Sequence, residues 1–247
     1  MMNLFKVLIP TAGKGSRISL NHPKSFLKIN SKTIISRTLS TFYEYDRCPT
    51  VIINPKFESL FEDHFLKENL KAEIIFQNQS KGMGHAILQY EKSQYYNKFE
   101  NIILAWGDIP FINKKTLSKI ITHHIKNNND FTFPTIKVKN PYTLIIRDSD
   151  NKIKKIEESR DNNISKHKGE RDIGIFIFKK SIIFNALKKK LTNRFSKSTG
   201  EHGFLYIIEY LINQGRNVEG LLIASFKETL SINTIKDYEI AKLRLKL

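Results

Sequence analysis

Residues 5–17 read FKVLIPTAGKGSR, and this stretch decides the fold class. The apolar run Phe5–Pro10 predicts a buried strand, and the glycine-rich residues after it predict a tight loop. Glycines placed there let backbone N–H groups point at an anion, while Lys14 and Arg17 bring positive charge. The spacing matches neither a P-loop nor a G-x-G-x-x-G dinucleotide loop. The stretch therefore predicts a phosphate-binding loop or, as the alternative, an ordinary tight turn between a strand and a helix.

Short apolar runs alternate with helical patterns as far as residue 130, which is typical of βα units and a mostly parallel sheet. The elements expected there are strands at Thr50–Ile53, Glu73–Gln77 and Asn101–Trp106, and helices at Thr33–Phe42, Lys56–Leu66, Gly84–Tyr96 and around Leu117–Ile125. The elements expected beyond it are extended segments at Phe131–Val138, Thr143–Arg147, Ile153–Glu158 and Asp172–Phe178, then helices at Ile182–Leu191, Phe204–Gln214 and from Ile235, with a strand at Val218–Ile223. We therefore expect one α/β domain over residues 1–247, a Rossmann-like, mostly parallel mixed sheet flanked by helices, with an inserted β portion.

The composition is strongly basic. The 247 residues include 41 Lys and Arg against 24 Asp and Glu, a formal net charge of +17, and 40% of the residues are hydrophobic. A disordered chain is excluded by that hydrophobic content. A surplus of positive charge suggests a nucleic acid or a phosphate-rich ligand, but the lysines are spread over the whole chain without a recognition motif. Solvated basic faces are the simpler interpretation for most of them.

Three further observations concern the environment of the chain. No apolar run approaches the roughly 18 residues that span a bilayer, so no membrane insertion is expected. The first residues lack the basic start and continuous apolar run of a signal peptide. Cys48 is the single cysteine and cannot form an internal disulfide. Together these features predict a cytoplasmic protein.

Two later loops carry residues suited to a nucleotide. The segment Gln77–Ala86 reads QNQSKGMGHA, where two glycines just before a helix permit close approach of a flat ligand. A Gln side chain can pair with the edge of a base. Asp108 follows the clearest predicted strand, at the edge where open α/β sheets bind ligands. A single carboxylate there suits Mg²⁺, which is typically held by one or two carboxylates and substrate phosphates.

Several motifs occur in one order along the chain. They are VLIPTAGKGSR at Val7–Arg17, Pro23-Lys24, Gln77 followed by GMGHA at Gly82–Ala86, GDIP at Gly107–Pro110, Glu158, Gly174-Ile175 and INT at Ile232–Thr234. This series resembles the nucleotidyltransferases of the sugar-phosphate type and is most similar to the uridylyltransferase half of bacterial N-acetylglucosamine-1-phosphate uridylyltransferases. The segment Pro23–Ile29 also resembles cytidylyltransferases that act on phosphorylated alcohols. The resemblance implies a GT-A-like fold, with a nucleotide-binding part near residues 1–130 and an acceptor-binding part near 131–247.

The resemblance also implies a reaction and its residues. An acceptor phosphate attacks the α-phosphorus of a nucleoside triphosphate, UTP or CTP, and pyrophosphate leaves, with Mg²⁺ as cofactor. The catalytic residues implied are Lys14, Arg17 and Lys24. The nucleotide-binding residues implied are Ala12, Gly13, Gly15, Gln77, Gly82 and Met83. The metal ligands implied are Asp108 and Asn233, and the acceptor-binding residues implied are Thr143, Glu158 and Asp172.

Departures from the uridylyltransferase pattern fall at the acceptor end. Thr143 stands where those enzymes usually have Gly, and Asp172 where they have Asn, while their EYYLTD segment survives as Glu201. An acceptor other than N-acetylglucosamine 1-phosphate is therefore expected. Two carboxylates, Glu158 and Asp172, would suit a phosphorylated amino alcohol, amino acid or amino sugar. Alternatively, one of them pairs with a basic residue, for which the candidates are Arg147, Arg160 and Arg171.

Two other functions compete with this one. A glycosyltransferase would use a D-x-D metal site, and the nearest candidate is Asp148-Ser149-Asp150, a charged segment more typical of a hairpin tip. A nucleic-acid-binding protein is favoured by charge alone. The partners expected are a nucleoside triphosphate and a phosphorylated small molecule, with no nucleic acid, and a homo-oligomer is allowed. The base and the acceptor stay open, and surface-polysaccharide precursor synthesis is one setting for the cytidylyltransferase alternative.

Overall fold

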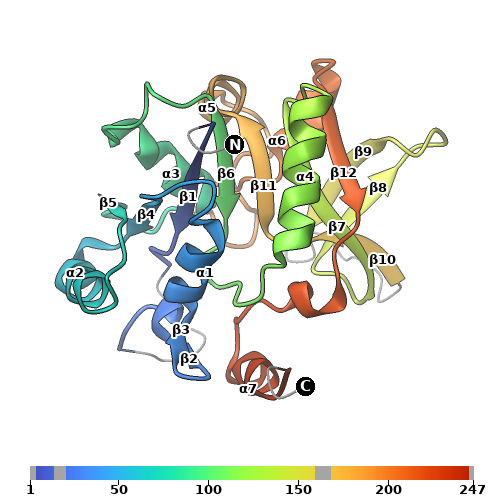
Figure 1. Ribbon diagram of the computed structural model, residues 1–247. Coiled ribbons are helices and arrows are strands. Elements are labelled where there is room, and N and C mark those ends of the chain that lie inside the picture. Colours follow the sequence, from blue (N-terminus) through green and yellow to red (C-terminus); the bar gives the residue numbers. More distant parts are fainter. Residues whose placement is uncertain (1–3, 14–20, 159–167, 245–247) are drawn as a thin grey trace.

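The computed structural model describes residues 4–13, 21–158 and 168–244. The described strands form one ten-stranded mixed sheet and a small two-stranded one, with helices on both faces of the large sheet (Figure 1). The strands are β1 (Phe5–Pro10), β2 (Lys28–Ile29), β3 (Lys32–Thr33), β4 (Thr50–Ile53), β5 (Glu73–Phe76), β6 (Asn101–Ala105), β7 (Phe131–Lys139), β8 (Thr143–Arg147), β9 (Ile153–Glu158), β10 (Lys168–Asp172), β11 (Ile175–Lys179) and β12 (Val218–Leu222). The α-helices are α1 (Ile34–Phe42), α2 (Glu58–Lys67), α3 (Met83–Leu88), α4 (Lys114–Lys126), α5 (Lys180–Lys188), α6 (Ile207–Asn213) and α7 (Ile235–Arg244).

Short 3₁₀ helices complete the described structure. They are η2 (Lys24–Phe26), η3 (Pro55–Phe57), η4 (Gln89–Lys92) and η5 (Phe226–Thr229). No helix among the described residues has both the length and the apolar character needed to cross a bilayer.

The large sheet has two halves that differ in strand direction. Its order is β5-β4-β1-β6-β11-β7-β10-β8-β9, and β12 pairs with β7. The first four strands are mutually parallel, while β11 runs antiparallel to β6 and the pairs from β11 to β9 are all antiparallel. Because β7, β8 and β12 run in the same direction as β1, most strands of the described sheet still point one way. The predicted fold class, a mostly parallel mixed sheet with an inserted β portion, is confirmed.

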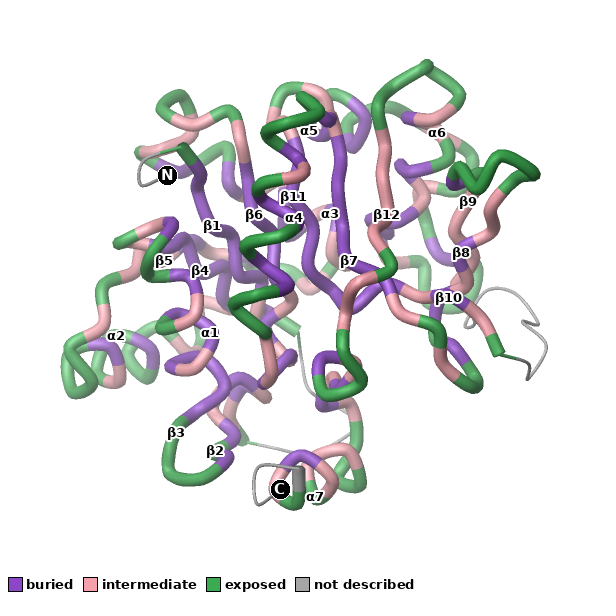
Figure 2. The backbone as a smooth tube through the Cα atoms, turned by 45° about the vertical axis from the view of Figure 1, so that its right-hand side comes forward, coloured by how far each residue is buried: buried purple, intermediate pink, exposed green. Residues whose placement is uncertain are grey.

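Alternation along the strands divides the core between the two faces. In β1, Phe5, Val7 and Ile9 pack on the face that α1, α2 and α4 cover, whereas Leu8 packs on the face covered by α3, α5 and α6. This is the period of two expected of a strand buried on both sides. Figure 2 shows the result, with buried residues along the central strands of the sheet and exposed residues on the outer helix turns and loops.

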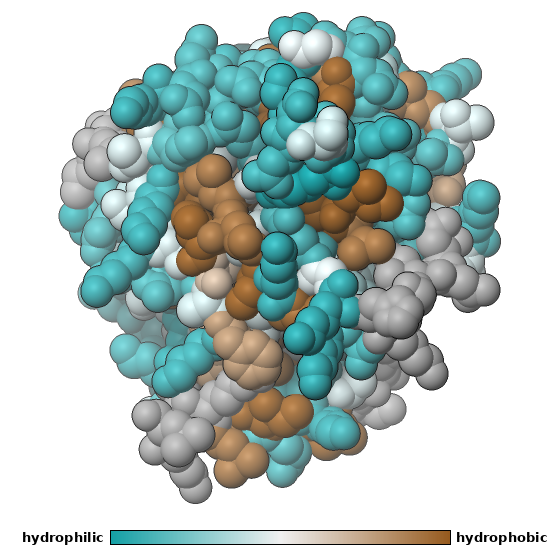
Figure 3. Space-filling model, turned by 90° about the vertical axis from the view of Figure 1, so that its right-hand side faces the viewer, coloured by the Kyte–Doolittle hydropathy of each residue, from teal (hydrophilic) through white to brown (hydrophobic). Residues whose placement is uncertain are grey.

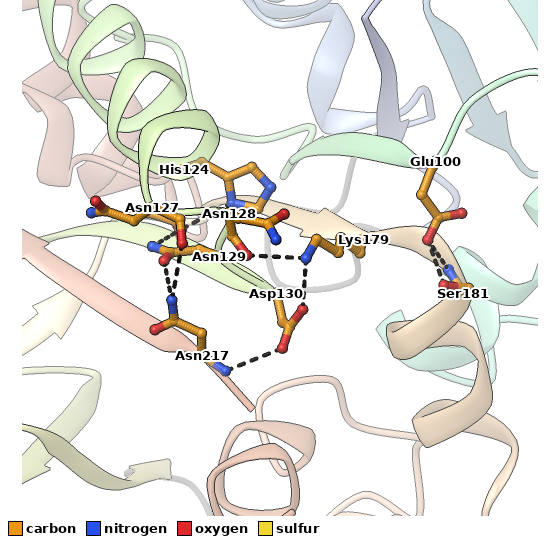
Figure 4. A network of polar contacts seen from close by, with 10 residues as sticks. Glu100, His124, Asn127, Asn128, Asn129, Asp130, Lys179, Ser181 and Asn217 are labelled. Carbon is orange, nitrogen blue, oxygen red and sulfur yellow. Dashed lines mark hydrogen bonds and ion pairs between the residues drawn. The ribbon is translucent and has the colours of Figure 1, made fainter. Parts of the chain in front are cut away.

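A polar turn between α4 and β7 fixes the edge of the sheet that lies away from the loops after β1 and β6 (Figure 4). Asn129 is fully buried, and its amide donates to Thr132 Oγ1 at 2.9 Å. The Asp130 carboxylate accepts from Asn217 N at 3.1 Å and from Lys179 Nζ at 3.0 Å. These contacts join α4, β7, β11 and the start of β12. The same hydrogen bonds satisfy the polar groups of the buried turn and hold the start of β12 in place.

Three expectations about element boundaries need correction. The segment Asp172–Phe178 is not one strand: β10 ends at Asp172 and β11 begins at Ile175, because Gly174 adopts a φ of +78° that a continuous strand does not allow. The helix expected at Gly84–Tyr96 ends at Leu88 and continues as η4. The helix expected from Phe204 begins at Ile207. Helix α1 agrees with its prediction, and the Thr33 side chain caps it by accepting from Ser36 N at 3.1 Å.

Apolar side chains also reach the surface. Figure 3 shows them in patches between hydrophilic side chains, on the face of the molecule that carries the β8–β9 hairpin. Across the described residues, the more exposed large apolar side chains include Leu222, Phe226 and Ile235, at 52%, 65% and 61%. Scattered exposed apolar residues of this kind are ordinary in folded proteins.

Candidate active site

Three adjoining cavities lie where β1 and β6 end, and Gly13, Met83 and Trp106 line all three. We name two of them. The central cavity, about 300 Å³, lies between Lys24, Asp108, Asn233 and the turn Arg171–Gly174. The loop cavity, about 310 Å³, is lined by Ala12, Gly13, Gln77, Ser80, Gly82, Met83, Glu201 and His202, among other residues. The third, about 160 Å³, lies against Thr11, Lys24 and Gly107. The carboxyl ends of parallel strands thus meet at one hollow edge.

Lys24, Asp108 and Asn233 form a cluster in the central cavity. Lys24 Nζ donates to Asn233 Oδ1 at 3.0 Å and lies 4.0 Å from Asp108 Oδ2. Asp108 follows β6, and its backbone oxygen accepts from Ile232 N at 3.0 Å, which brings Asn233 alongside. These residues come from three distant parts of the chain, so the cluster is a product of the fold.

A small apolar core holds this cluster together. Leu27 and Ile29, just after Lys24, pack with Ile34, and Ile232, just before Asn233, packs in the same group as Leu230 and Ala241. Asn233 is further fixed because its backbone N–H donates to Asp237 Oδ2 at 3.0 Å, at the start of α7. The segment just before α7 therefore brings Asn233 to a cavity whose other lining residues come from distant parts of the chain.

The Asp108 carboxylate has unusual electrostatics. Burial raises the pKa of Asp108, and the nearby Lys24 ammonium and the Ser231 hydroxyl partly oppose that shift. Its side chain is still 26% exposed, toward the cavity. An anionic carboxylate and the Asn233 amide oxygen are hard oxygen donors, which fits Mg²⁺, an ion that keeps most of its positions for waters and substrate phosphates. The described residues contain no cluster of three or more His, Cys, Asp or Glu suited to a metal.

The loop cavity brings five predicted nucleotide-binding residues together: Ala12, Gly13, Gln77, Gly82 and Met83. Gln77 is buried, and its Nε2 donates to Gly82 O at 3.1 Å and to His85 Nδ1 at 2.9 Å. Because both donors are used, the side chain offers its carbonyl oxygen to a ligand. Ser80 Oγ donates to Ala12 O at 3.1 Å and so ties this loop to the first one.

Residues 202–203, which precede α6, closely approach residues 81–84, which lead into α3. Gly84 N donates to His202 O at 3.0 Å, and His202 N donates to Lys81 O at 2.8 Å. A Cβ on Gly82, whose φ is +96°, would lie 2.4 Å from His202 O, and one on Gly84 would lie 2.2 Å from Gly203 O. Both glycines are therefore required for this close backbone approach. We name the contact of residues 81–84 with 202–203 the loop clamp.

His202 is a residue of the site that sequence reasoning missed. It is buried, its Nε2 shares a 3.0 Å hydrogen bond with the Tyr206 hydroxyl, and burial lowers the pKa of His202 to about 4. The imidazole is thus neutral at pH 7. The two glycines before α3 were the available signal, since they indicate that another segment approaches closely, but they do not say which one.

The predicted acceptor residues lie on three neighbouring strands, β10, β8 and β9, and line two cavities. Thr143 is fully buried and donates from Oγ1 to Asp172 Oδ2 at 2.6 Å, and Gly174 N donates to Asp172 Oδ1 at 2.8 Å. Asp172 lines the central cavity and Thr143 lies behind it. Glu158 instead lines a neighbouring cavity of about 390 Å³, with Tyr206 and Glu209, which shares Leu205 with the central one. Thr143 thus lies between the other two: it is hydrogen-bonded to Asp172 on one side and is the register partner of Glu158 on the other, while Asp172 and Glu158 line different cavities.

The arginines proposed as carboxylate partners have other contacts. Arg147 is bidentate to Glu170, at 2.8 and 2.6 Å, and Arg171 Nε donates to the Asp172 backbone oxygen at 2.8 Å. Arg160 lies outside the described residues, as do Lys14, Gly15 and Arg17. Asp148–Asp150 forms the β8–β9 hairpin tip, where Asp148 Oδ1 accepts from Asp150 N at 3.0 Å and from Lys152 N at 2.9 Å. The D-x-D segment is therefore a turn.

A mixed sheet with two loops closing on a cavity, and a lysine, a carboxylate and an amide at its edge, defines an α/β protein built to handle a nucleotide. Residues 7–173 match the family model described as the MobA-like NTP transferase domain. The chain belongs to this family, and the predicted enzyme class, a nucleotidyltransferase, is confirmed. The predicted resemblance to sugar-phosphate nucleotidyltransferases is confirmed as well by the relatives below.

Similar proteins agree with this placement. The chain is 31% identical over 249 residues to the bifunctional protein GlmU of Thermodesulfovibrio yellowstonii, covering 97% of this chain and 52% of that protein. It is 28% identical over 229 residues to GlmU of Streptococcus agalactiae, covering 92% and 48%. The chain thus spans about half the length of these curated relatives.

Solved structures share the fold. A UDP-glucose pyrophosphorylase complexed with UDP-glucose superposes with a TM-score of 0.76 at 19% identity and covers 98% of each chain. A protein of Bacillus anthracis, provisionally assigned as a glucose-1-phosphate thymidylyltransferase and bound to sucrose, gives 0.78 at 14% identity, covering 97% of this chain and 94% of that one. The arrangement of the sheet and helices described above is therefore that of known nucleotidyltransferases.

Proposed function

We propose that this protein is a magnesium-dependent nucleotidyltransferase that transfers a nucleoside monophosphate from UTP or CTP to a phosphorylated small molecule, a sugar 1-phosphate, and releases pyrophosphate. The observation that carries the proposal is the cluster of Lys24, Asp108 and Asn233, which places one ammonium, one carboxylate and one amide oxygen in the same cavity. These groups suit a triphosphate, its metal ion and an attacking phosphate.

The chemistry follows from positions rather than from a covalent intermediate. An oxygen of the acceptor phosphate forms a bond to the α-phosphorus, and the bond from that phosphorus to the pyrophosphate oxygen breaks. Lys24 Nζ, 3.0 Å from Asn233 and 4.0 Å from Asp108, is placed to neutralise charge on both reacting phosphates. Asp108 and Asn233 would hold Mg²⁺, which when bound neutralises the leaving pyrophosphate.

The loop cavity supplies the nucleotide site of this proposal. Gln77 offers a carbonyl oxygen, which can accept from N3–H of uracil or from the amino group of cytosine. Gly82 and Met83 lie beside it in the wall of the same cavity. This arrangement favours a pyrimidine and leaves the choice between uracil and cytosine to experiment.

One observation favours a second candidate acceptor. Asp172 and Glu201 both line the central cavity, so carboxylates face the acceptor from two sides in addition to Asp108. Glu201, rather than Glu158, is the second carboxylate there. An acceptor with an amine, such as a phosphorylated amino alcohol, amino acid or amino sugar, would be held by such groups, and CTP would be the donor in the cytidylyltransferase alternative.

A pyrophosphate-release screen tests the proposal. Four nucleoside triphosphates are combined with sugar 1-phosphates, phosphorylated polyols and phosphorylated amino compounds, with and without Mg²⁺. We expect release with UTP or CTP and one acceptor class, dependent on Mg²⁺ and reduced at least about 100-fold in Lys24→Ala. The matched control is Lys67→Ala, an exposed lysine on α2. Activity confined to purine triphosphates, or equal activity in Lys24→Ala, would reject it. Transfer from an NDP-sugar without pyrophosphate exchange would instead support a glycosyltransferase.

A further inference from the structure

A fourth cavity lies outside the candidate active site and is lined by positive charge. It encloses about 400 Å³. Its lining residues come from β3, α1, the loop before α4 and η5, and include Lys32, Arg37, Asn113, Ser225, Lys227 and Glu228. In Figure 1 the segment between β12 and α7, which contains η5, lies below α4. Lining groups that carry formal charge are three cations and one carboxylate.

The carboxylate of this cavity is already satisfied. Glu228 Oε1 accepts from Asn113 N at 3.2 Å, and Oε2 accepts from Thr116 Oγ1 at 3.0 Å and from Ser225 N and Oγ at 2.8 and 2.9 Å. It is 2% exposed. Glu228 therefore holds the loop before α4 against η5, and it makes no ion pair with the three cations within the described part of the chain.

The three cations, in contrast, have no counter-ion in the described part of the chain. Lys32 and Lys227 are exposed, and their side chains have no hydrogen-bonded or ionic partner among the described residues. Arg37 uses Nη2 to donate to Ile29 O, but its buried Nε has no partner within the described structure. Burial accordingly lowers the pKa of Arg37. A buried N–H without an acceptor is costly, and Arg37 brings a positive charge without a counter-ion among the described residues to the wall of this cavity.

We propose that this cavity is a second phosphate-binding site, which takes inorganic phosphate, pyrophosphate or a small phosphorylated molecule through Lys32, Arg37 and Lys227. Ser40, Thr41 and Ser225 line the same space, and their hydroxyl groups already donate to Ser36 O, Arg37 O and Glu228 Oε2. Phosphate suits this set because its oxygens accept several charge-assisted hydrogen bonds at once. The proposal concerns binding and does not depend on the reaction catalysed at the central cavity.

The site is placed to influence the candidate active site. Pro110–Asn113, on its rim, follows Asp108 directly along the chain, and η5 precedes Asn233. The two segments are joined at the rim by Glu228 and Asn113, and near the active site by Ile232 N and Asp108 O at 3.0 Å. An anion held by Lys32, Arg37 and Lys227 would bridge β3, α1 and η5, and it would restrain the segment that leads to Asn233.

Calorimetric titration of the full chain tests the site. The background variant Lys24→Gln weakens phosphate binding at the central cavity, and inorganic phosphate, pyrophosphate and glucose 1-phosphate are titrated separately at constant ionic strength. Adding Lys32→Gln and Lys227→Gln is expected to weaken the tightest of these at least about tenfold, which is about 1.4 kcal/mol. The matched control adds Lys67→Gln and Lys71→Gln, two exposed lysines, and removes the same charge.

The affinities of the Lys32/Lys227 variant and of the Lys67/Lys71 control decide whether the site exists. Retained binding in the control together with loss in the Lys32/Lys227 variant supports the site, and the probe that binds most tightly identifies its occupant. Equal affinity in the two variants would overturn the proposal, as would the absence of binding by all three probes in Lys24→Gln. Melting curves of each variant without ligand check that the fold is intact, and failure of the pyrophosphate-release screen would leave this result unaffected.

Discussion

The two sides of the candidate active site are built in different ways. At the loop cavity, backbone meets backbone: in the loop clamp, Gly82 and Gly84 approach His202 and Gly203 so closely that any Cβ would collide. At the proposed acceptor side of the central cavity, the geometry depends on a pair of side chains, because Thr143 lies behind Asp172 and donates a hydrogen bond to it. Geometry fixed by backbone tolerates little change, whereas a side-chain pair can be exchanged for another. The proposed nucleotide side thus has a rigid geometry, whereas the proposed acceptor side can change through side-chain substitution.

The largest expected effect comes from Asp108→Asn. Loss of the carboxylate should lower pyrophosphate release at least about 100-fold, because charge is no longer available to bind the metal. Stability should not fall with it. Since burial raises the folded-state pKa of Asp108, the folded protein binds more protons than the unfolded chain, so this group costs stability once the pH exceeds both values. The asparagine variant should melt at or above the wild-type temperature at pH 7.

Asp150→Asn, at the hairpin tip, is the control for that experiment and should leave the rate unchanged. A variant of Asp108 with full activity, or with a clearly lower melting temperature at pH 7, would contradict the expectation. The two measurements together would show whether the Asp108 carboxylate lowers the stability of the folded protein while it supports activity.

His202 gives a pH test of the nucleotide side. Its folded pKa of about 4 lies below the ordinary value near 6.5, so its stabilising contribution is complete above pH 6.5 and is lost as the pH falls toward 4. The loss should reach about 3 kcal/mol of unfolding free energy. Denaturant titrations between pH 7 and 4 measure it. His202→Gln should flatten this dependence by about half, because buried His124, whose pKa burial also lowers to about 4, contributes a similar part. An unchanged slope in His202→Gln would show that the loop clamp does not bury this ring.

Gly82→Ala tests the loop clamp directly. The new Cβ would lie 2.4 Å from His202 O at a φ of +96°, so we expect a loss of about 2 kcal/mol in stability and a higher KM for the nucleoside triphosphate. Gly215→Ala is the matched control, because Gly215 also has a positive φ, +68°, but open space around it. Both are measured by thermal melting and initial rates. Equal effects at the two glycines would mean that backbone conformation alone, and not close approach, sets the requirement.

The smallest effect is expected at the acceptor side. Thr143→Val removes the donor to Asp172 Oδ2 and should cost about 1–2 kcal/mol, because a buried carboxylate oxygen loses its partner. The KM for the acceptor should rise while that for the nucleotide stays the same, and Thr143→Ser should restore it. Asp172→Asn should alter acceptor preference. If preference is the same in Asp172→Asn, the acceptor side is not governed by this pair.

The sequence predicts the loop cavity and the position of Asp108 better than it predicts the surroundings of Asp172. The parallel strands, the loops after them and the placement of Asp108 and Gln77 follow from local patterns, because strand ends and glycines carry their own signals. The neighbours of Asp172 do not, since Thr143 lies on another strand and Glu158 lies one strand further on. Register decides which side chains meet across antiparallel strands, and it depends on turns that composition does not determine. His202 was missed for a related reason, because its role lies in backbone contacts made across the fold.

The contact between Lys24 and Asn233 has a consequence for measurement. These residues are 209 positions apart along the chain, yet Nζ and Oδ1 are 3.0 Å from each other. A chain in which α7 has come loose would keep its sheet, its circular dichroism and most of its core, and would lose this cluster. Enzyme activity would therefore disappear before the bulk of the protein melts, so an activity assay on heated samples would report the docking of α7, while spectroscopy on the same samples would report the sheet.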